Sequence, residues 1–288
     1  MPSRIWTFLI VSLLFVATAM TMIMYTKHRE TAFLDRQVVV HEVIVHSTAF
    51  AVSEQILREQ RNVQLFADEY RKMIIRLAQY PTDEATRASL NTRLHQRFPN
   101  ALTFTITNSQ GVTILSDIDS LVGETCRNEI VDYYRLAKTA GAKARNPILI
   151  HPQPDNYHYD VMAQVGDSVF FVSILPKAVT EILRNHQIPG HELILVKKQD
   201  LSLIEIAAKG VRDVLVRDIR LSQEERERIR TAESVIGTEW RLIDLPEAKY
   251  AEEYQRQLWK EATMVLMILV LGGLMMMMFV WRKDLRRR

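Results

Sequence analysis

The sequence has one cysteine, nine prolines and nine glycines in 288 residues. The single cysteine, Cys126, excludes an internal disulfide; a partly buried apolar role is its simplest interpretation, and an intermolecular bridge is the alternative. The sequence also lacks a phosphate-binding loop, a zinc-ligand spacing and a supported catalytic triad. We therefore expect no cofactor, no metal ion and no enzymatic activity.

Charge is absent from two long stretches, residues 5–26 and 262–281. Each is about long enough to cross a hydrocarbon core of ~30 Å as a helix. The basic cluster at 282–288 places the C-terminal end in the cytoplasm, because cytoplasmic flanks are rich in Lys and Arg. Ala17-Thr18-Ala19 resembles a signal-peptidase site, but the apolar run continues through Met24, which favours an uncleaved signal anchor.

Proline and glycine are both absent from Lys27 to Tyr80, which predicts one very long helix or two helices nearly end to end. Apolar residues recur along its second half at heptad-like spacing: Val52, Ile56, Val63, Phe66, Tyr70, Met73 and Leu77. This stripe is typical of packing against the protein's own domain or of dimerisation, and both can hold at different heights. We expect a homodimer.

Beyond Pro81 the hydrophobic period changes from helical to alternating. Thr82 or Asp83 is the expected N-cap of a helix over 84–97. Strands are expected at 101–107, 112–115, 148–150, 159–165 and 168–175, with a helix over 125–140 that Gly141 ends. This order, β-β-α-β-β-β, predicts an antiparallel sheet of about five strands.

A second, smaller copy of the pattern follows a helix at 176–189. Strands are expected at 191–197, 201–207, 211–219, 233–236 and 239–245, and Ser222 is the expected N-cap of a short helix. Pro246 is expected at the first position of the final helix, which continues into the second apolar stretch. The fold class is therefore α+β, with a long N-terminal helix and two antiparallel sheets between two membrane helices. The expected segments are 1–26 (anchor), 27–100 (helices), 101–176 (distal unit), 177–246 (proximal unit), 247–281 (final helix and span) and 282–288 (basic tail).

Three segments carry a family resemblance: FTITNSQGVTILSDIDSLVGE at 104–124, GDSVFFVSILP at 166–176 and GTEWRLIDLP at 237–246. Their order resembles the double Cache sensor regions of bacterial transmembrane receptors, which contain two PAS-like units. Residues 151–165 and 188–206 are similar to sensor regions found in front of GGDEF-type diguanylate cyclases. The resemblance covers residues 27–281.

The resemblance implies a bacterial inner-membrane sensor that crosses the membrane twice, with a periplasmic central domain and a small-molecule ligand. No GGDEF-like loop, kinase box or chemoreceptor signalling hairpin occurs in the sequence. We therefore expect the output, through cyclic-di-GMP or a kinase, to come from a cytoplasmic or membrane partner or from a domain missing in this chain. The Arg, Trp and Asp pattern of amino-acid-binding relatives is not found either. A membrane-anchored adaptor that binds a partner protein is the alternative, and an exported enzyme has no supporting residues.

The densest polar and aromatic run of the exported part lies at 145–160, where the resemblance places the cover of a ligand pocket. The candidate ligand-binding residues are Arg145, His151, Tyr157, Tyr159 and Asp160. Arg145 can grip a carboxylate with two hydrogen bonds. Strand alternation puts Tyr157 and Tyr159 on one face and His158 and Asp160 on the other, and we favour the tyrosine face. The alternative is that the histidines and Asp160 satisfy backbone groups of a proline-rich loop. The basic tail is expected to contact anionic lipid rather than nucleic acid.

Overall fold

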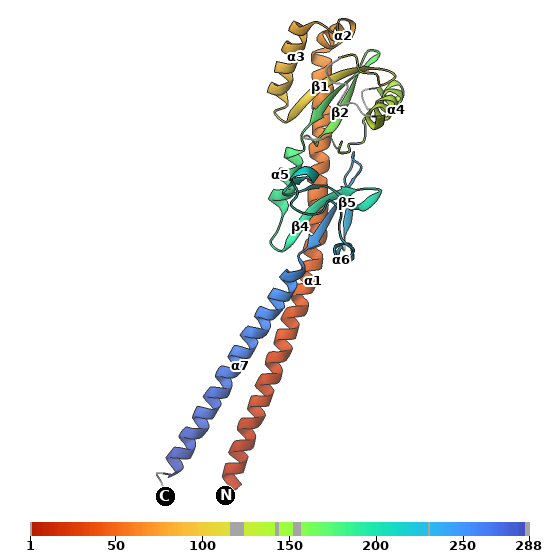
Figure 1. Cartoon of the computed structure of the whole chain (residues 1–288). Coiled ribbons are helices and arrows are strands. Elements are labelled where there is room, and N and C mark those ends of the chain that lie inside the picture. The colour runs from red at the N-terminus through yellow and green to blue at the C-terminus, as the bar shows by residue number, and fades with distance from the viewer. Residues whose placement is uncertain (1, 116–123, 142–143, 152–156, 230, 286–288) are drawn as a thin grey trace. The chain divides into compact units, whose positions relative to one another are not determined.

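The computed structural model of the chain describes residues 2–115, 124–141, 144–151, 157–229 and 231–285. The chain forms two compact units. One is continuous, Glu42–Pro246, and the other joins both ends of the chain, Met1–His41 and Glu247–Arg288. Figure 1 labels their helices and strands.

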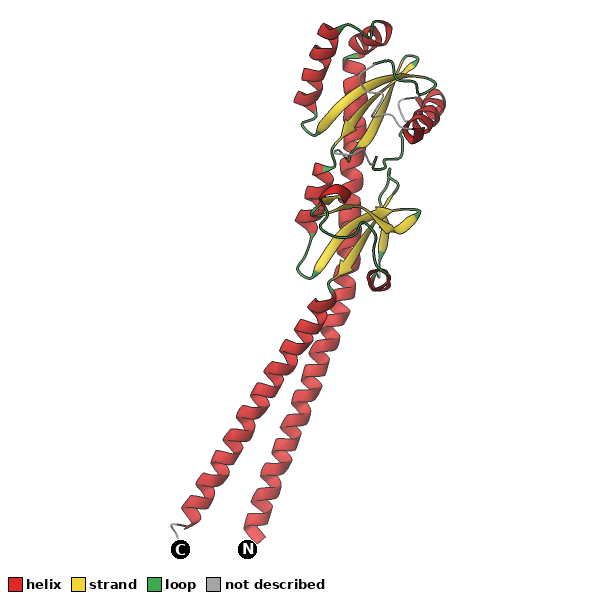
Figure 2. Cartoon of the chain, in the orientation of Figure 1, coloured by secondary structure: helices red, strands yellow, loops and turns green. Residues whose placement is uncertain are grey.

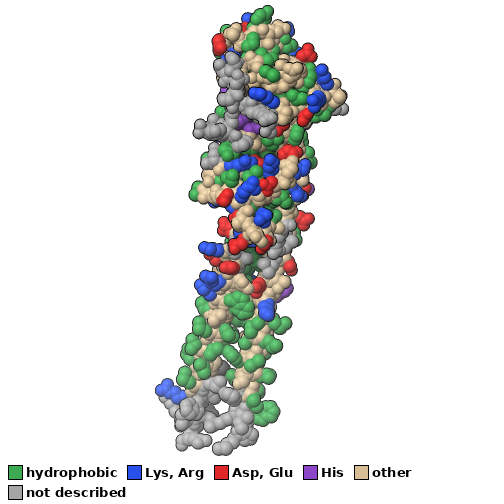
Figure 3. All heavy atoms as spheres, turned by 45° about the vertical axis from the view of Figure 1, so that its right-hand side comes forward, with side chains coloured by type: hydrophobic (Ala, Val, Ile, Leu, Met, Phe, Trp, Pro, Cys, Tyr) green, Lys and Arg blue, Asp and Glu red, His purple; other side chains and the backbone are tan. Residues whose placement is uncertain are grey.

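The unit formed by the chain ends consists of helical segments. Helix α1 (Pro2–Glu69) begins in this unit, and the whole of α7 (Ala248–Leu285) belongs to it. Two stretches, Leu9–Phe33 and Glu252–Met275, are long and apolar enough to cross a membrane by length and composition. Figure 3 shows the apolar side chains that cover both helices. The two apolar helices predicted from the sequence are therefore present.

These two helices contact each other through aromatic and polar side chains. The Phe33 ring stacks on Tyr254 with a centroid separation of 3.8 Å, and Tyr250 lies 6.4 Å from it. One turn away, Gln255 Nε2 donates to the Glu30 carboxylate at 2.5 Å. The contact joins residues at the start of α7 to residues near the end of the first apolar stretch.

Within the larger unit, α1 is packed against the sheets. Val52, Ile56, Val63 and Phe66 of the predicted stripe are buried in the main hydrophobic core. Packing against the protein's own domain therefore accounts for this part of the stripe. The helix ends at Glu69, and α2 (Arg71–Gln79) follows after a single residue, so the run without proline or glycine forms two helices nearly end to end.

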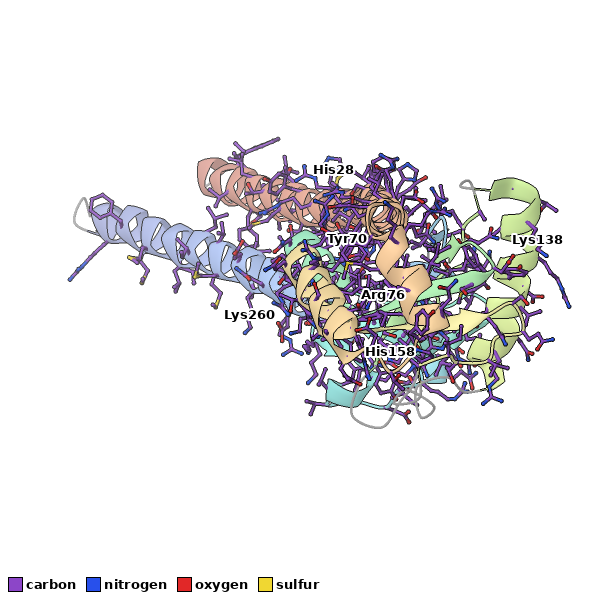
Figure 4. The ribbon with its side chains drawn as sticks, turned by 90° about the horizontal axis from the view of Figure 1, so that it is seen from above. His28, Tyr70, Arg76, Lys138, His158 and Lys260 are labelled. Carbon is purple, nitrogen blue, oxygen red and sulfur yellow. The ribbon has the colours of Figure 1, made fainter. Side chains whose placement is uncertain are left out.

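A third helix, α3 (Glu84–Arg97), follows a short turn. Asp83 is its N-cap, because its carboxylate accepts from Thr86 N at 3.0 Å. Arg76 Nε donates to the same carboxylate at 2.6 Å and ties α2 to the start of α3. Figure 4 looks down on this end of the unit and labels Tyr70 and Arg76.

The distal sheet has three strands among the described residues, not the five expected. They are β1 (Ala101–Asn108), β2 (Tyr159–Val165) and β3 (Ser168–Ile174), in the antiparallel order β1-β3-β2. The β2–β3 hairpin turns at Gly166 and Asp167 as predicted, with Gly166 at φ +63°. Helix α4 (Glu124–Ala140) also matches its prediction, and Figure 2 shows it beside the sheet.

Two predicted distal strands are wrong. Residues 112–115 make only a bridge between Thr107 and Thr113 and do not continue as a ladder. Ile148 pairs with Thr238, next to the proximal sheet, because its backbone exchanges hydrogen bonds with Gly237 and Glu239. The segment 148–150 therefore connects the two sheets and adds no strand to the distal one.

The proximal sheet is the larger of the two, in contrast to the prediction. It contains β4 (His191–Lys197), β5 (Asp200–Ala207), β6 (Gly210–Val211), β7 (Ala232–Ser234) and β8 (Trp240–Pro246), in the order β6-β5-β4-β8-β7. Helix α5 (Lys177–His186) precedes it, and α6 (Gln223–Arg228) begins with the predicted cap, Ser222.

The strand predicted at 211–219 is wrong, because the chain turns into the short helix η3 (Arg212–Val214). Arg212 Nε donates to Ile204 O at 2.9 Å and its guanidinium pairs with Glu205, which draws the backbone out of the sheet.

Pro246 also differs from the prediction. It is the last residue of β8, paired with His191, and its carbonyl accepts from Arg228 at 2.7 Å, so α7 begins only at Ala248.

Candidate functional site

Strand β2 presents different chemistry on its two faces. On one face, Tyr159 is fully buried beside Trp240, with ring centroids 6.1 Å apart, and its hydroxyl donates to Glu59 of α1. Tyr157 is half-buried and packs at the margin of the same core, where the Arg212 guanidinium lies 5.9 Å from its ring. Tyr157 and Tyr159 both contact this core, which faces α1, and this is consistent with their predicted position on one face.

The opposite face carries a buried polar cluster. His151 Nε2 lies 3.6 Å from an oxygen of Asp160 and 3.6 Å from an oxygen of Glu129. His158 Nε2 lies 3.7 Å from the other oxygen of Asp160, and the two imidazoles stack with centroids 5.6 Å apart. We call Glu129, His151, His158 and Asp160 the Asp160 cluster.

Neighbouring hydrogen bonds hold the Asp160 cluster in place. Ser173 Oγ on β3 donates to Asp160 Oδ1 at 2.7 Å. Asn146 Nδ2 donates to Asp160 O at 2.9 Å, and Asn146 Oδ1 accepts from Met162 N at 3.2 Å. The Asn146 carbonyl in turn accepts from Gln60 of α1 at 2.8 Å. The connecting segment is thereby fixed to both β2 and α1.

Burial shifts the protonation of this cluster. The pKa of Glu129 is raised to about 7, chiefly by burial and then by the negative charge of Asp160. Burial lowers the pKa of His151, and the Asp160 charge partly opposes this. Near neutral pH, Glu129 is therefore poised between its charged and neutral forms, while His151 favours the neutral imidazole.

Thr105 and Thr107 add two hydroxyls to the same face of the sheet. Register places Thr105 opposite Phe171 and Thr107 opposite Val169, and Thr103 opposite Ser173. The face is covered by an apolar stripe of α4 that includes Ile130 and Tyr133. Both hydroxyls of Thr105 and Thr107 are buried, and neither has a hydrogen-bond partner in the described part of the chain.

Four of the five predicted site residues divide between the two faces. His151 and Asp160 meet in the Asp160 cluster, whereas Tyr157 and Tyr159 lie toward the core. Arg145 is half-buried, and its Nη1 donates to the Ala144 carbonyl at 2.7 Å. Its charge lowers the pKa of Tyr133, although burial dominates and raises that pKa to about 12.

Sequence reasoning missed Glu129, Thr105 and Thr107. A signal for Glu129 was present, because it lies on the α4 stripe, one turn before the buried Tyr133. The alternating threonines of β1 were assigned to a strand, but their face could not be assigned without the position of α4. The proline-rich residues 152–156 lie outside the described residues.

No family model and no curated protein matches the chain. The sensor domain of the histidine kinase DctB from V. cholerae is 10% identical with a TM-score of 0.46, over 74% of this chain and 98% of that one. The ligand-binding domain of the Campylobacter jejuni chemoreceptor Tlp3, solved with L-valine, is 13% identical with a TM-score of 0.45, over 77% and 97%. That of the Pseudomonas aeruginosa PAO1 amino-acid chemoreceptor PctB, solved with L-Arg, is 14% identical with a TM-score of 0.38, over 75% and 95%. At these values, none of the likenesses assigns a role to a residue of this chain.

Proposed function

We propose that the chain is a sensor of double Cache type that binds a small polar molecule on the Asp160 face of its distal sheet. The observation that carries the proposal is the pair of buried hydroxyls on Thr105 and Thr107, which have no hydrogen-bond partner among the described residues. An unsatisfied buried polar group costs about 1–3 kcal/mol. A ligand that hydrogen-bonds to either hydroxyl recovers part of that cost.

The cluster also indicates the class of ligand. Glu129 and Asp160 offer carboxylate oxygens as acceptors, and burial lowers the pKa of His151, which favours its neutral form. An ammonium or hydroxyl group is therefore favoured over a simple anion at this position. Arg145, whose charge acts on Tyr133 of α4, is the candidate partner for a carboxylate elsewhere on the same molecule.

A thermal-shift screen of metabolite pools on the full chain in lipid nanodiscs tests the proposal. Wild type is compared with Asp160→Asn and with Asp167→Asn, an exposed matched control in the β2–β3 turn. We expect a compound that raises the melting temperature of wild type and of Asp167→Asn but not of Asp160→Asn. Repeating the screen with EDTA separates an organic ligand from a bound metal ion. A shift retained by Asp160→Asn contradicts the proposal, and no shift with any pool favours the adaptor that binds a partner protein.

Transmission is proposed to run through the membrane helices. Helix α1 spans Pro2 to Glu69, so the same helix includes the first candidate span and residues bonded to the distal sheet. Strand β8 leads within two residues into α7, which includes the second candidate span. In the proposed topology, both termini are cytoplasmic, the larger unit is periplasmic, and the inner membrane of a bacterium is crossed twice. The output is a cytoplasmic partner or domain of cyclic-di-GMP or kinase signalling.

A homodimer through α1 belongs to the same proposal. Val43 and Phe50, seven residues apart on α1, are 61% and 62% exposed, and His46 is exposed between them. Val39, Val43, His46 and Phe50 are separated by four, three and four residues, which is the spacing of a coiled-coil seam.

The basic tail begins at the exposed Arg282, and we propose that it contacts anionic lipid.

A further inference from the structure

A cavity of about 390 Å³ lies away from the Asp160 face, within the larger unit. Its volume falls in the range of small-molecule sites. The lining comes from residues just before β2 and just after β3, from α5, and from β6 and η3: Tyr157, Leu175, Pro176, Lys177, Thr180, Glu181, Arg184, Gly210, Val211 and Val214. The cavity therefore lies where the distal and proximal sheets are connected.

Helix α5 forms one wall of this junction cavity. Lys177, Thr180, Glu181 and Arg184 recur at intervals of three and four residues, which places them on one helical face. The buried Val179 and Leu183 belong to the other face and pack into the core. Consequently, α5 is anchored by its apolar face and presents a charged face to the cavity.

The cavity has an apolar wall and a rim with an excess of positive charge. Lys177 and Arg184 carry two positive charges and Glu181 one negative charge, and no ion pair joins them in the described part of the chain. Arg184 Nε donates to Ala208 O at 3.3 Å, which orients the guanidinium and leaves its two terminal nitrogens for a ligand. The Tyr157 ring supplies apolar area and is held under the Arg212 guanidinium at 5.9 Å.

We propose that the junction cavity is a second ligand site, which takes a small monocarboxylate with an apolar body. Arg184 and Lys177 bind the carboxylate, and one net positive charge at the rim matches a single negative charge on the ligand. Tyr157, Leu175 and Val211 surround the apolar body. The site is independent of the Asp160 cluster, because Tyr157 belongs to the core margin and Asp160 faces the other side of β2.

The test uses the full chain in nanodiscs and ¹⁹F NMR titration with 4-fluorobenzoate, with 4-fluorobenzyl alcohol as a neutral probe of the same shape. We expect saturable binding of the benzoate, at least tenfold tighter than that of the alcohol. The double variant Lys177→Glu/Arg184→Glu is expected to weaken benzoate binding at least tenfold. The control Lys198→Glu, in the exposed β4–β5 turn, leaves it unchanged.

Val211→Trp provides a second variant that fills the cavity and keeps every charge, and it is also expected to abolish binding. Asp160→Asn is expected to leave benzoate binding unchanged, so the outcome is separate from that of the proposed sensor site. Equal affinity for the alcohol, unchanged binding in the double variant, or no saturable binding overturns the proposal.

Discussion

The hydroxyl of Tyr159 donates a hydrogen bond to the carboxylate of Glu59, and both side chains are buried. Gln55 Nε2 donates to the other oxygen of the same carboxylate at 2.8 Å. Tyr159 is on β2 and Glu59 is on α1, so the bond joins the strand that carries Asp160 to the helix that includes the first candidate span. Together with the hydrogen bonds that join Asp160 to Asn146 and Asn146 to Gln60, it is a physical connection through which a change at Asp160 reaches α1 in the proposed mechanism.

Replacing Tyr159 with Phe removes this bond and leaves Glu59 buried. Burial already raises the pKa of Glu59, while the bond from Tyr159 opposes that shift by stabilising the charged form. Without the bond, the charged carboxylate is destabilised more than the neutral acid. We expect the free energy of unfolding to fall by about 1–3 kcal/mol, with a larger loss at pH 8 than at pH 5.

Chemical unfolding of the full chain in nanodiscs at the two pH values measures this loss. Tyr157→Phe is the matched control, because the Tyr157 hydroxyl makes no hydrogen bond within the described residues. The same loss at both pH values would contradict the coupling between Tyr159 and the charge of Glu59.

Glu129 makes the stability of the distal module depend on pH. Its pKa is raised from 4.5 to about 7, so the folded state binds this proton more tightly than the unfolded state. The contribution of Glu129 to stability is present below pH 4.5 and is lost as the pH rises to 7. At about 1.4 kcal/mol per pKa unit, Glu129 lowers the free energy of unfolding of the wild type by up to about 3 kcal/mol between pH 4.5 and pH 7. We expect Glu129→Gln to remove this pH dependence.

The measurement is thermal unfolding followed by tryptophan fluorescence between pH 4.5 and 8, with Trp240 as the buried reporter. Relative to wild type, the melting temperature of Glu129→Gln is expected to increase as the pH rises. Glu69→Gln, at an exposed position, is the control and should follow wild type. Parallel pH profiles for wild type and Glu129→Gln would refute the assignment of this titration.

The buried hydroxyls of Thr105 and Thr107 are expected to lower the stability of the free chain and to contact the bound ligand. Thr→Val at either position keeps the shape of the side chain and removes a polar group without a described partner. Each variant is expected to gain about 1 kcal/mol of unfolding free energy and to lose the thermal shift given by the ligand. Thr92→Val, at an exposed position of α3, is the control. A variant that keeps the ligand shift would show that the hydroxyls do not contact the ligand.

The dimer seam is tested by disulfide crosslinking in membranes. Val43→Cys and Phe50→Cys, each combined with Cys126→Ser, are expected to form crosslinked dimers under mild oxidation. Lys72→Cys on α2 provides an exposed control away from the seam and should stay monomeric. Equal crosslinking at all three positions would indicate random collision instead of a seam.

Local signals predicted much of the fold. The turn at Gly166 and Asp167 sets the register of the β2–β3 hairpin. Asp83 caps α3 because its carboxylate accepts a hydrogen bond from the backbone N–H of Thr86. Ser222 likewise forms a capping box with Glu225. Each of these features depends on residues within a few positions of one another.

Features that depend on distant partners were missed. Ile148 has strand chemistry but bonds to residues next to the proximal sheet, and Arg212 turns the chain because Glu205 lies on the neighbouring strand. The site shows the same division. His151 and Asp160 stood out as polar residues in one run, whereas Glu129 joins them only because α4 packs on that face of the sheet.

Hydrogen–deuterium exchange of the full chain, with and without the compound found by thermal shift, distinguishes a ligand on the Asp160 face from a ligand bound elsewhere. We expect ligand-dependent protection in peptides that contain Thr105, Thr107 and Asp160, and weaker protection around Glu59 on α1. Protection confined to α5 and Tyr157, or absent from β1 and β2, would contradict the placement of the sensor site on the Asp160 face.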